Sequence, residues 1–546
     1  MVIKKPRIVI IGAGMAGLAA ANKLYKCAAS KELFELLVVE GGTRIGGRVN
    51  TSEFCGDRVE LGATWIHGIG GSPVHQIAQE INSLESEKPW ECMDSLTDEP
   101  VTISEGGLIL NPSFVEPIND LFNKLMDFAQ GKSKSSEDGI SKNNQISFSE
   151  FFAEFLNAGG KGSLESLSLG SFLRKGLEAY LDTKKEEKDE AFQSNWNSKS
   201  LESAIFSMLE NIQREYTSAD DLNKLDFIAE SEYRMFPGEE ITIAKGYISI
   251  IESLASVLPE GVIQLGRKVS RIEWQPADVQ TTSGMENGNN GYVSRPVKLQ
   301  FVDGTSISAD HLIVTVSLGV LKHGVCQDSC LFSPALPNCK IQAISRLGFG
   351  VVNKLFLQLN SNKNFPFLQM VFHQQDSMIP WWIKKTASLS PIYNKSNVLL
   401  SWFAGEEALA LEMLSDEEVL NGVSETISNL LPNSQSHCNG TVSSDQFLNK
   451  EVKFGKVLKS KWGTDPLFFG SYSYVAVGSS GDDLDTMAEP LPLPKSVVNK
   501  NVCPLQILFA GEATHRTHYS TTHGAYFSGI REANRLLQHY KCSNDI

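Results

Sequence analysis

The chain lacks any long hydrophobic run: none of its apolar stretches approaches the ~20 residues that span a bilayer. Positive charge is also scarce, because 49 Lys and Arg residues stand against 64 Asp and Glu residues, for a formal net charge of -15 over 546 residues. This balance argues against a nucleic-acid or anionic-membrane partner and favours cationic ligands. The length predicts at least two domains.

Cysteine is sparse as well. The nine cysteines are odd in number and scattered, and no pair has metal-ligand spacing, so we expect no metal site and reduced thiols. Lys4, Lys5 and Arg7 before an apolar stretch are similar to a signal peptide, but regularly spaced glycines break that stretch. With no peroxisomal tripeptide or prenylation box at the end, the expected location is cytoplasmic.

The start of the chain holds its most specific pattern. An apolar run leads into Gly12, Gly14 and Gly17 at G-x-G-x-x-G spacing, and a second apolar run ends at Glu40. The order of strand, glycines, helix, strand and acid is typical of a dinucleotide site. We expect Gly12 to form the tight turn, Gly14 to let the backbone approach a pyrophosphate, and Gly17 to pack the helix on the strand. Glu40 is expected to hydrogen-bond the adenosine ribose.

Apolar periodicity predicts the main elements elsewhere. Predicted helices cover 114–130, 247–257 and 525–540, with a mainly helical region from about 85 to 240, and predicted strands cover 261–265, 269–274, 297–301, 306–307, 311–317, 354–359, 398–403 and 505–512. Polar segments at 131–147 and 277–294 predict loops, and the charge run at 184–190 predicts a solvated surface.

Sheet-like segments recur at the start, middle and end of the chain, so we predict a discontinuous α/β cofactor domain beside a second, α+β domain that binds the substrate. The predicted cofactor domain comprises 1–84, 245–330 and 456–546, and the substrate domain 85–244 and 331–455.

Further motifs follow the fingerprint: GGTRIGGR at 41–48, GATWIHG at 62–68, Asn-Lys at 353–354, GSYSY at 470–474 and STTHGA at 520–525. With these motifs the chain resembles the flavin-containing amine oxidases over nearly its whole length. That family includes monoamine oxidases, polyamine oxidases and histone lysine demethylases. The likeness is strongest to plant polyamine oxidases of the cytosolic type that acts on spermine and thermospermine. It implies a Rossmann-like FAD-binding domain of the amine oxidase type.

The resemblance implies roles for individual residues around FAD. Arg48 would contact the phosphate region, Val269 the adenine through its backbone, Glu512 the ribityl side, and Thr522 the pyrimidine end. Ser471 stands where monoamine oxidases carry the cysteine that bonds the flavin, so the FAD is expected to be non-covalent. The full implied set is Gly12, Gly14, Ala16, Gly17, Glu40, Gly41, Arg48, Gly62, Ala63, Thr64, Trp65, Val269, Trp462, Gly511, Glu512, Thr521 and Thr522.

The resemblance also implies the catalytic group. Lys354 would hold a water against flavin N5, although a lysine on a strand is ordinarily an exposed residue. Tyr472 and Thr521 would form the two walls beside the flavin, where monoamine oxidases have two tyrosines; this more open slot suits a long flexible polyamine. His67 would be a polar contact to the substrate. Glu239 would bind the substrate as one of a cluster of acids expected along the substrate tunnel. That cluster is Glu230, Glu232, Glu239 and Glu240.

The implied activity is hydride transfer from a carbon beside a secondary amine of spermine or thermospermine to FAD. Imine hydrolysis then gives spermidine and 3-aminopropanal, and dioxygen is reduced to hydrogen peroxide. The implied partners are therefore a polyamine and O2, with the oligomeric state left open. Neither a Ser/His/Asp triad nor a metal cluster competes for the chemistry.

Two alternatives remain. A histone demethylase-like oxidase would carry an additional N-terminal helical module and a long helical insertion, neither of which the sequence pattern indicates. A flavin-binding module without catalysis would not need Lys354, Trp462 and Tyr472, all of which are present.

Overall fold

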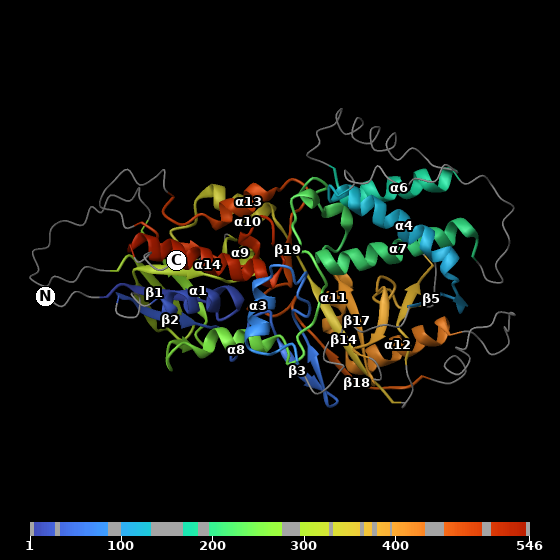
Figure 1. Cartoon of the computed structure of the whole chain (residues 1–546), viewed down its shortest axis with the longest axis horizontal. Helices are drawn as coiled ribbons and strands as arrows, with labels where there is room; N and C mark the ends of the chain where they lie inside the picture. Colours follow the sequence, from blue (N-terminus) through green and yellow to red (C-terminus); the bar gives the residue numbers. More distant parts are fainter. Residues whose placement is uncertain are drawn as a thin grey trace, which may run out of the picture.

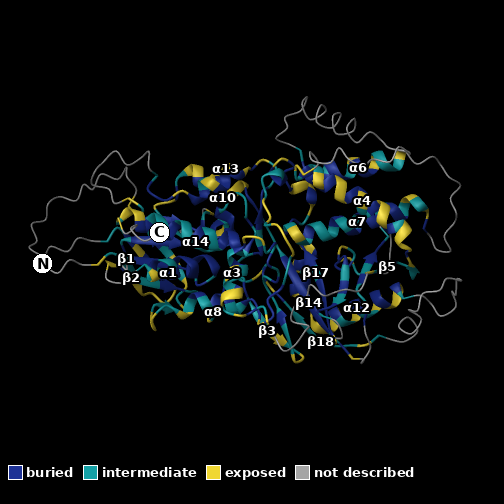
Figure 2. Ribbon diagram, viewed as in Figure 1, coloured by how far each residue is buried: buried dark blue, intermediate teal, exposed yellow. Residues whose placement is uncertain are grey.

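The computed structural model consists of two halves that lie side by side along its long axis (Figure 1). In Figure 2, buried residues gather in the sheets and on the inner sides of the helices, and exposed residues lie on the outside. The structure describes residues 5–27, 33–85, 100–132, 167–183, 196–275, 295–326, 331–360, 365–373, 379–393, 396–431, 452–493 and 504–541.

A five-stranded parallel sheet forms the centre of the first half. Its strand order, β20-β11-β1-β2-β7, brings segments from the end, the middle and the start of the chain side by side. Ile10 in the central strand pairs with Val38 on one side and Ile313 on the other. Both faces are covered, so the strands are nearly continuous Val, Ile and Leu. The strands are β1 (Arg7–Ile11), β2 (Glu35–Val39), β7 (Ile263–Gln264), β11 (His311–Val314) and β20 (Ile507–Phe509).

Successive side chains of β1 enter different cores, as the period of two requires. Ile8 and Ile10 join the core beneath four helices. Two of these helices, α1 and α14, pack closely, because a Cβ on Gly529 would lie 2.1 Å from the Ala16 oxygen. The helices on this face are α1 (Met15–Lys26), α3 (Pro73–Glu80), α8 (Ile248–Ser256) and α14 (Thr522–His539).

Val9 and Ile11 join the core on the opposite face. A four-stranded sheet of order β10-β9-β8-β12 and three helices supply the rest of this core. These elements are β8 (Val269–Glu273), β9 (Val297–Phe301), β10 (Ser306–Ala309), β12 (Phe332–Ser333), α9 (Leu318–Gly324), α10 (Asn338–Arg346) and α13 (Gly481–Ala488).

The second half is built on a seven-stranded sheet of order β18-β14-β17-β16-β15-β5-β6. The strands are β5 (Val101–Ser104), β6 (Leu108–Ile109), β14 (Val352–Leu359), β15 (Leu368–Val371), β16 (Ser388–Pro391), β17 (Val398–Ala404) and β18 (Phe454–Lys459). α7, together with α4 and α6, forms one core with part of the sheet, and α11 and α12 pack on β14, β17 and β18. The helices are α4 (Pro112–Ala129), α6 (Leu169–Thr183), α7 (Ser198–Thr217), α11 (Glu406–Met413) and α12 (Asp416–Leu430).

Short elements join the halves. The described chain also contains two antiparallel pairs, β3 with β4 and β13 with β19, and three 3-10 turns, η4, η5 and η7. Their bounds are β3 (Thr51–Phe54), β4 (Asp57–Glu60), β13 (Gly348–Gly350), β19 (Tyr472–Tyr474), η4 (Leu222–Lys224), η5 (Ala229–Ser231) and η7 (Glu512–Thr514).

The predicted helices at 114–130, 247–257 and 525–540 are confirmed as α4, α8 and α14. The region from 85 to 240 is not purely helical, because β5 and β6 extend the seven-stranded sheet. The chain passes from one half to the other later than the predicted boundaries at 331 and 456. After 331, β12 still pairs with β8 and α10 still packs on α13, in the half with the parallel sheet. At 456, β18 still pairs with β14 in the seven-stranded sheet. Most of the loop at 131–147, and all of 184–190 and 277–294, lie outside the described residues.

The mixed α/β architecture with a parallel sheet agrees with the predicted class. Among the helices of the described chain, none combines the length and the hydropathy that crossing a bilayer requires.

Candidate active site

A cavity of about 1010 Å³ is lined by residues of both halves. On one side it begins at the carboxyl ends of parallel strands, where Ile11 ends β1, Val314 ends β11 and Glu40 follows β2. This is the edge at which open α/β sheets bind ligands. On the other side it is lined by the seven-stranded sheet, including Lys354 on β14 and Trp402 on β17.

The glycine loop has the geometry that its sequence predicts. Gly12 has φ +103°, and a Cβ there would lie 2.5 Å from Thr315 Oγ1. A Cβ on Gly17 would lie 1.9 Å from the Gly12 oxygen, so the glycine allows α1 to pack on β1. Gly14 lines the cavity and has no atom closer than 3.7 Å to its Cβ position, which leaves room for a ligand's approach. It also caps α1 without a side-chain bond, so the helix N-terminus is available to an anion.

The Glu40 carboxylate lies at the end of β2 and organises the loops on both sides of it. Oε2 accepts the Ala13 N–H at 2.8 Å, and Oε1 accepts the Gly42 N–H at 2.7 Å. Each carboxylate oxygen has a second lone pair, so two ribose hydroxyls can still be accepted. The predicted contact with the adenosine ribose stays a prediction, and the geometry is compatible with it.

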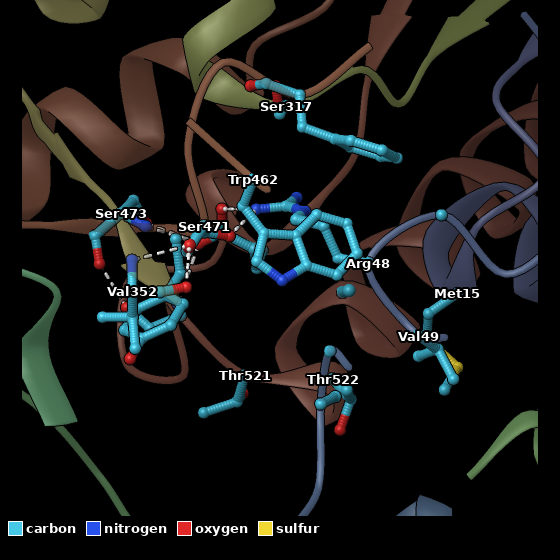
Figure 3. A pocket seen from close by; sticks show the side chains of 18 of the residues that line it. Met15, Arg48, Val49, Ser317, Val352, Trp462, Ser471, Ser473, Thr521 and Thr522 are labelled. Carbon is cyan, nitrogen blue, oxygen red and sulfur yellow. Dashed lines mark hydrogen bonds and ion pairs between the residues drawn. The ribbon is translucent and has the colours of Figure 1, made fainter. Parts of the chain in front are cut away.

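Arg48 and Glu512 meet on the cavity wall. Arg48 Nη1 donates to Glu512 Oε1 at 2.8 Å and to the Ser471 oxygen at 2.8 Å. The buried Glu512 carboxylate also accepts the Ser520 N–H at 2.9 Å and the hydroxyl of Ser473. Figure 3 shows Arg48, Ser471 and Ser473 near the Trp462 indole. Arg48 and Glu512 both line the cavity, and the other N–H groups of the guanidinium can bond a phosphate-bearing ligand there.

Lys354 is not an exposed strand residue: its side chain is buried and lines the cavity. Its ammonium donates to the backbone oxygens of Glu60 at 2.5 Å and Gly62 at 2.6 Å, and to the Thr64 hydroxyl. Burial lowers the pKa of Lys354 to about 7, although the nearby Glu60 carboxyl opposes that shift. The lysine can therefore change its protonation state near neutral pH, as a proton-exchanging group must.

Aromatic side chains enclose the same region. The Trp462 indole donates from Nε1 to the Leu61 oxygen at 2.9 Å, and its ring meets Phe468 edge to face. The Tyr472 hydroxyl donates to the backbone oxygen of Glu215. Burial raises the pKa of this phenol, so it stays protonated. In Figure 3, Thr521 and Thr522 lie across the open space from Trp462.

Thr521 and Thr522 owe their positions to the start of α14. The Thr521 hydroxyl accepts the Gly524 N–H at 3.0 Å as the N-cap and donates to the His518 oxygen at 2.7 Å. The Thr522 hydroxyl pairs with the Tyr247 hydroxyl, which is fully buried next to α8. These bonds hold the helix N-terminus against the cavity.

Three further carboxyl groups line the cavity. Glu240 bonds His67 Nδ1 at 3.0 Å, and this partner holds its pKa below the usual value. Burial, with Asp226 nearby, raises the pKa of Glu230 to about 7. Burial also raises the pKa of Glu215 well above its usual value, and its Oε1 has no hydrogen-bond partner.

Nearly all of the predicted site residues line this one cavity. Gly17 does not, because its role is to pack α1 behind the loop. Glu239 also lies away from the cavity: it is exposed and absent from the lining, whereas Glu240 takes the inner position. Glu215 and Tyr233 line the cavity but were not predicted, since nothing in α7 or near η5 marks them as distinct from ordinary helix and loop residues. The predicted residues that the cavity brings together are Gly12, Gly14, Ala16, Glu40, Gly41, Arg48, Gly62, Ala63, Thr64, Trp65, His67, Val269, Lys354, Trp462, Tyr472, Gly511, Glu512, Thr521 and Thr522.

Comparison with known proteins identifies the family. A family profile described as flavin containing amine oxidoreductase matches residues 15–537. The chain belongs to this family. It is 56% identical over 560 residues to "Probable polyamine oxidase 5" of Arabidopsis thaliana, covering 99% of each protein. It is 42% identical over 574 residues to "Polyamine oxidase 1" of Oryza sativa subsp. japonica, again covering 99% of each. It is 31% identical over 547 residues to "Peroxisomal N(1)-acetyl-spermine/spermidine oxidase" of Bos taurus, covering 97% of the chain and 94% of the relative.

As a flavin-containing amine oxidoreductase the chain is an enzyme that uses FAD, in agreement with the prediction. The cavity suits this cofactor. It has a free helix N-terminus beside Gly14 for the pyrophosphate, the Glu40 carboxylate for a ribose, and Arg48 for a phosphate. Trp462 and Lys354 line the same cavity.

Proposed function

We propose that this chain is a polyamine oxidase that acts on a secondary amine of spermine or thermospermine. The observation that carries the proposal is a single cavity that joins the dinucleotide loop, Lys354 and a set of carboxyls. A linear polyamine presents several ammonium groups separated by methylenes. Glu240 lines the cavity as a carboxylate, and Glu215 and Glu230 add two carboxyl groups that can accept hydrogen bonds from ammonium groups. The printed names of the relatives support the same substrate class.

Glu240 and Glu230 are the proposed partners of the distal ammonium groups. Glu240 is half-exposed beside His67 and is the carboxylate nearer to solvent. Glu230 is buried, so its carboxyl holds a proton more readily than usual until a cation arrives. An ammonium within ~4–6 Å favours the charged form of the acid and would be bound in return.

The reacting nitrogen must be neutral, because an ammonium has no lone pair to assist the loss of hydride. Tyr472, Trp402 and Trp462 supply an apolar enclosure that disfavours a charged amine. The ammonium of Lys354 acts in the same direction, since like charges repel. FAD, when bound, supplies the hydride acceptor for this step.

Lys354 is proposed to bind and orient a water at the reacting centre and to exchange a proton with it. The hydroxyl of Thr64 and the carbonyls of Glu60 and Gly62 take the three N–H bonds of the ammonium and hold Nζ in place, so Lys354 binds the water when one of these bonds is released. The reaction consumes the amine, O2 and one water and yields an aminoaldehyde, a shorter amine and hydrogen peroxide. For spermine, attack on the exo side gives 3-aminopropanal and spermidine.

The proposal also covers the two domains, the attachment of FAD and the location of the protein. The half with the parallel sheet is the FAD-binding domain, of the discontinuous Rossmann-like type, and the half with the seven-stranded sheet binds the substrate. The FAD is non-covalent, because Ser471 has a hydroxyl where a flavin-bonding cysteine would stand; this hydroxyl bonds the Val352 backbone. The proposed location is cytoplasmic.

Product analysis tests the proposal. The purified flavoprotein is incubated in air with spermine, thermospermine, spermidine or a methylated lysine peptide, and peroxide and the amine products are measured. We expect spermidine and peroxide in equal amounts from spermine. 1,3-Diaminopropane in place of spermidine would contradict exo attack. Formaldehyde from the peptide would favour a demethylase, and no turnover with FAD bound would favour a non-catalytic module.

A further inference from the structure

Lys354 forms part of the wall between the main cavity and a second, smaller one. The inner cavity has a volume of about 40 Å³, enough for one water, whose share of liquid volume is roughly 30 Å³. Lys354, Thr64 and Leu400 line both cavities. Arg58 and Glu60 line only the inner one. The lysine therefore shares the inner cavity with polar, titratable neighbours.

Glu60 meets Lys354 in two ways. Its backbone oxygen accepts the ammonium at 2.5 Å, while its carboxyl accepts the Tyr247 N–H at 2.8 Å and the Thr51 hydroxyl at 2.8 Å. Between these two described side chains, no direct ion pair links the carboxylate to Nζ. Both nevertheless face the inner cavity, where one water can bridge two polar groups that are too far apart to bond directly.

We propose that Glu60 is the proton-exchange partner of Lys354, linked to it through a water in the inner cavity. In this step one of the three N–H bonds of the Lys354 ammonium turns from its present acceptor to the water and breaks, while an O–H bond forms on the Glu60 carboxylate, with the water passing the proton. The pair changes from ammonium and carboxylate to amine and carboxylic acid, and its net charge stays zero. Lys354 thus becomes a neutral amine without leaving an uncompensated charge in the interior, which would be costly. Glu60 is a positioning residue, because it acts through Lys354.

The surroundings suit such an exchange. Burial raises the pKa of the Glu60 carboxyl and lowers the pKa of Lys354, so it brings the proton affinities of the two groups closer together. Arg58 faces the same cavity from β4, donates to the Ala244 oxygen, and favours the carboxylate. The Tyr247 phenol is the remaining titratable neighbour; burial raises its pKa, so it stays protonated.

A purely structural role for Glu60 is the competing explanation, since its carboxyl holds the Tyr247 N–H at the start of α8. Glu60→Gln separates the two, because the amide oxygen still accepts that bond while the charge and the exchangeable proton are lost. Glu210→Gln is a matched control: burial also raises the pKa of Glu210 to about 7, but this acid pairs with Arg174 on α6.

The first test measures unfolding by urea from about pH 5 to about pH 9 for the FAD-bound wild type, Glu60→Gln, Lys354→Met and the double variant. In Glu60→Gln the carboxylate no longer raises the pKa of Lys354, so this pKa should fall further. The pH range in which the free energy of unfolding rises with pH should therefore begin about one pH unit lower. Without Lys354 the range in which stability falls with rising pH should extend upward by a similar amount. The double variant should lose both dependences. Additive pH effects of the two single variants would overturn the proposal.

Should Glu60→Gln fail to fold, infrared spectroscopy of the wild type and Lys354→Met gives a second readout. The carbonyl band of a buried carboxylic acid should persist to higher pH in Lys354→Met, and an unchanged titration would overturn the proposal. The catalytic role of this proton exchange rests on the proposed function. Neither the unfolding measurement nor the infrared measurement depends on turnover, so a negative result in them is distinguishable from failure of the proposed function. In the active enzyme, Glu60→Gln should shift the pH profile of flavin reduction by about one unit, and Glu210→Gln should not.

Discussion

Arg48 Nη1 lies 2.8 Å from Glu512 Oε1, and this ion pair joins the loop after β2 to the turn after β20. The carboxylate is buried and is also bonded by Ser473 and Ser520. Segments from opposite ends of the chain thus share one charged contact on the cavity wall. We therefore expect cofactor binding and the folding of the parallel-sheet half to be coupled at this point.

Arg48→Met should leave the Glu512 charge buried without its partner. Removing one member of a buried pair costs about 3–5 kcal/mol, and partial exposure of Arg48 places the expected loss at the lower end. Urea denaturation and FAD content per protein measure the effect. Lys224→Met, which breaks an exposed pair with Asp220, should cost under about 1 kcal/mol. Equal losses in the two variants would contradict the assignment.

Gly14→Ala and Gly17→Ala should differ in kind. A methyl on Gly17 would lie 1.9 Å from a backbone oxygen, so α1 must move and stability should fall by about 1–3 kcal/mol or more. A methyl on Gly14 meets nothing closer than 3.7 Å, so the protein should fold normally but bind FAD less tightly. Thermal unfolding of the FAD-free protein and flavin titration separate the two effects. Normal FAD affinity in Gly14→Ala would rule out the pyrophosphate contact.

Glu240→Gln and Glu239→Gln form a matched pair of neighbours. Glu240 lines the cavity and bonds His67, whereas Glu239 is exposed and outside it. Loss of one charged partner of an ammonium should raise KM for spermine about tenfold or more, equivalent to about 1.5–3 kcal/mol, with a smaller change in kcat. Glu239→Gln should leave KM unchanged. Steady-state peroxide assays check both, and equal KM values would remove Glu240 from the substrate site.

The chain should lose stability on acidification, partly through His523. Burial, with His518 nearby, lowers the pKa of His523 to about 3. Between about pH 6.5 and about pH 3 the unfolded chain binds a proton that the folded chain does not, so stability falls as the pH falls, by about 1.4 kcal/mol per pH unit for one proton. His523→Leu should reduce this slope, as measured by urea unfolding across that range. His75→Leu on α3 is the control, and an unchanged slope in His523→Leu would refute the assignment.

Local patterns predicted the parallel-sheet half well. The run before Gly12 and the runs at 311–317 and 505–512 are apolar enough to identify buried strands, and they became β1, β11 and β20. β5 was missed because a four-residue strand at the sheet's end has little period of its own and is defined by its pairing with β15. The same limit applies to the boundary near β12, a two-residue strand that is defined by its pairing with β8.

The candidate site shows what tertiary packing adds. Arg48, Lys354, Tyr472 and Thr521 were predicted from motifs, and all line the cavity. The choice between adjacent acids in the tunnel was not readable, because a loop has no fixed period to tell which side chain points inward. Glu60 and Glu215 were missed for another reason: their burial next to the site depends on strands and helices distant in sequence.

The central claim is most directly tested by anaerobic mixing of the purified flavoprotein with spermine or thermospermine, following the flavin's visible absorption. The account predicts rapid bleaching by either tetraamine, slower bleaching in Lys354→Met with FAD still bound, and none with a methylated lysine peptide. Retention of the absorption with both tetraamines, in protein shown to contain FAD, would contradict the assignment as a polyamine oxidase.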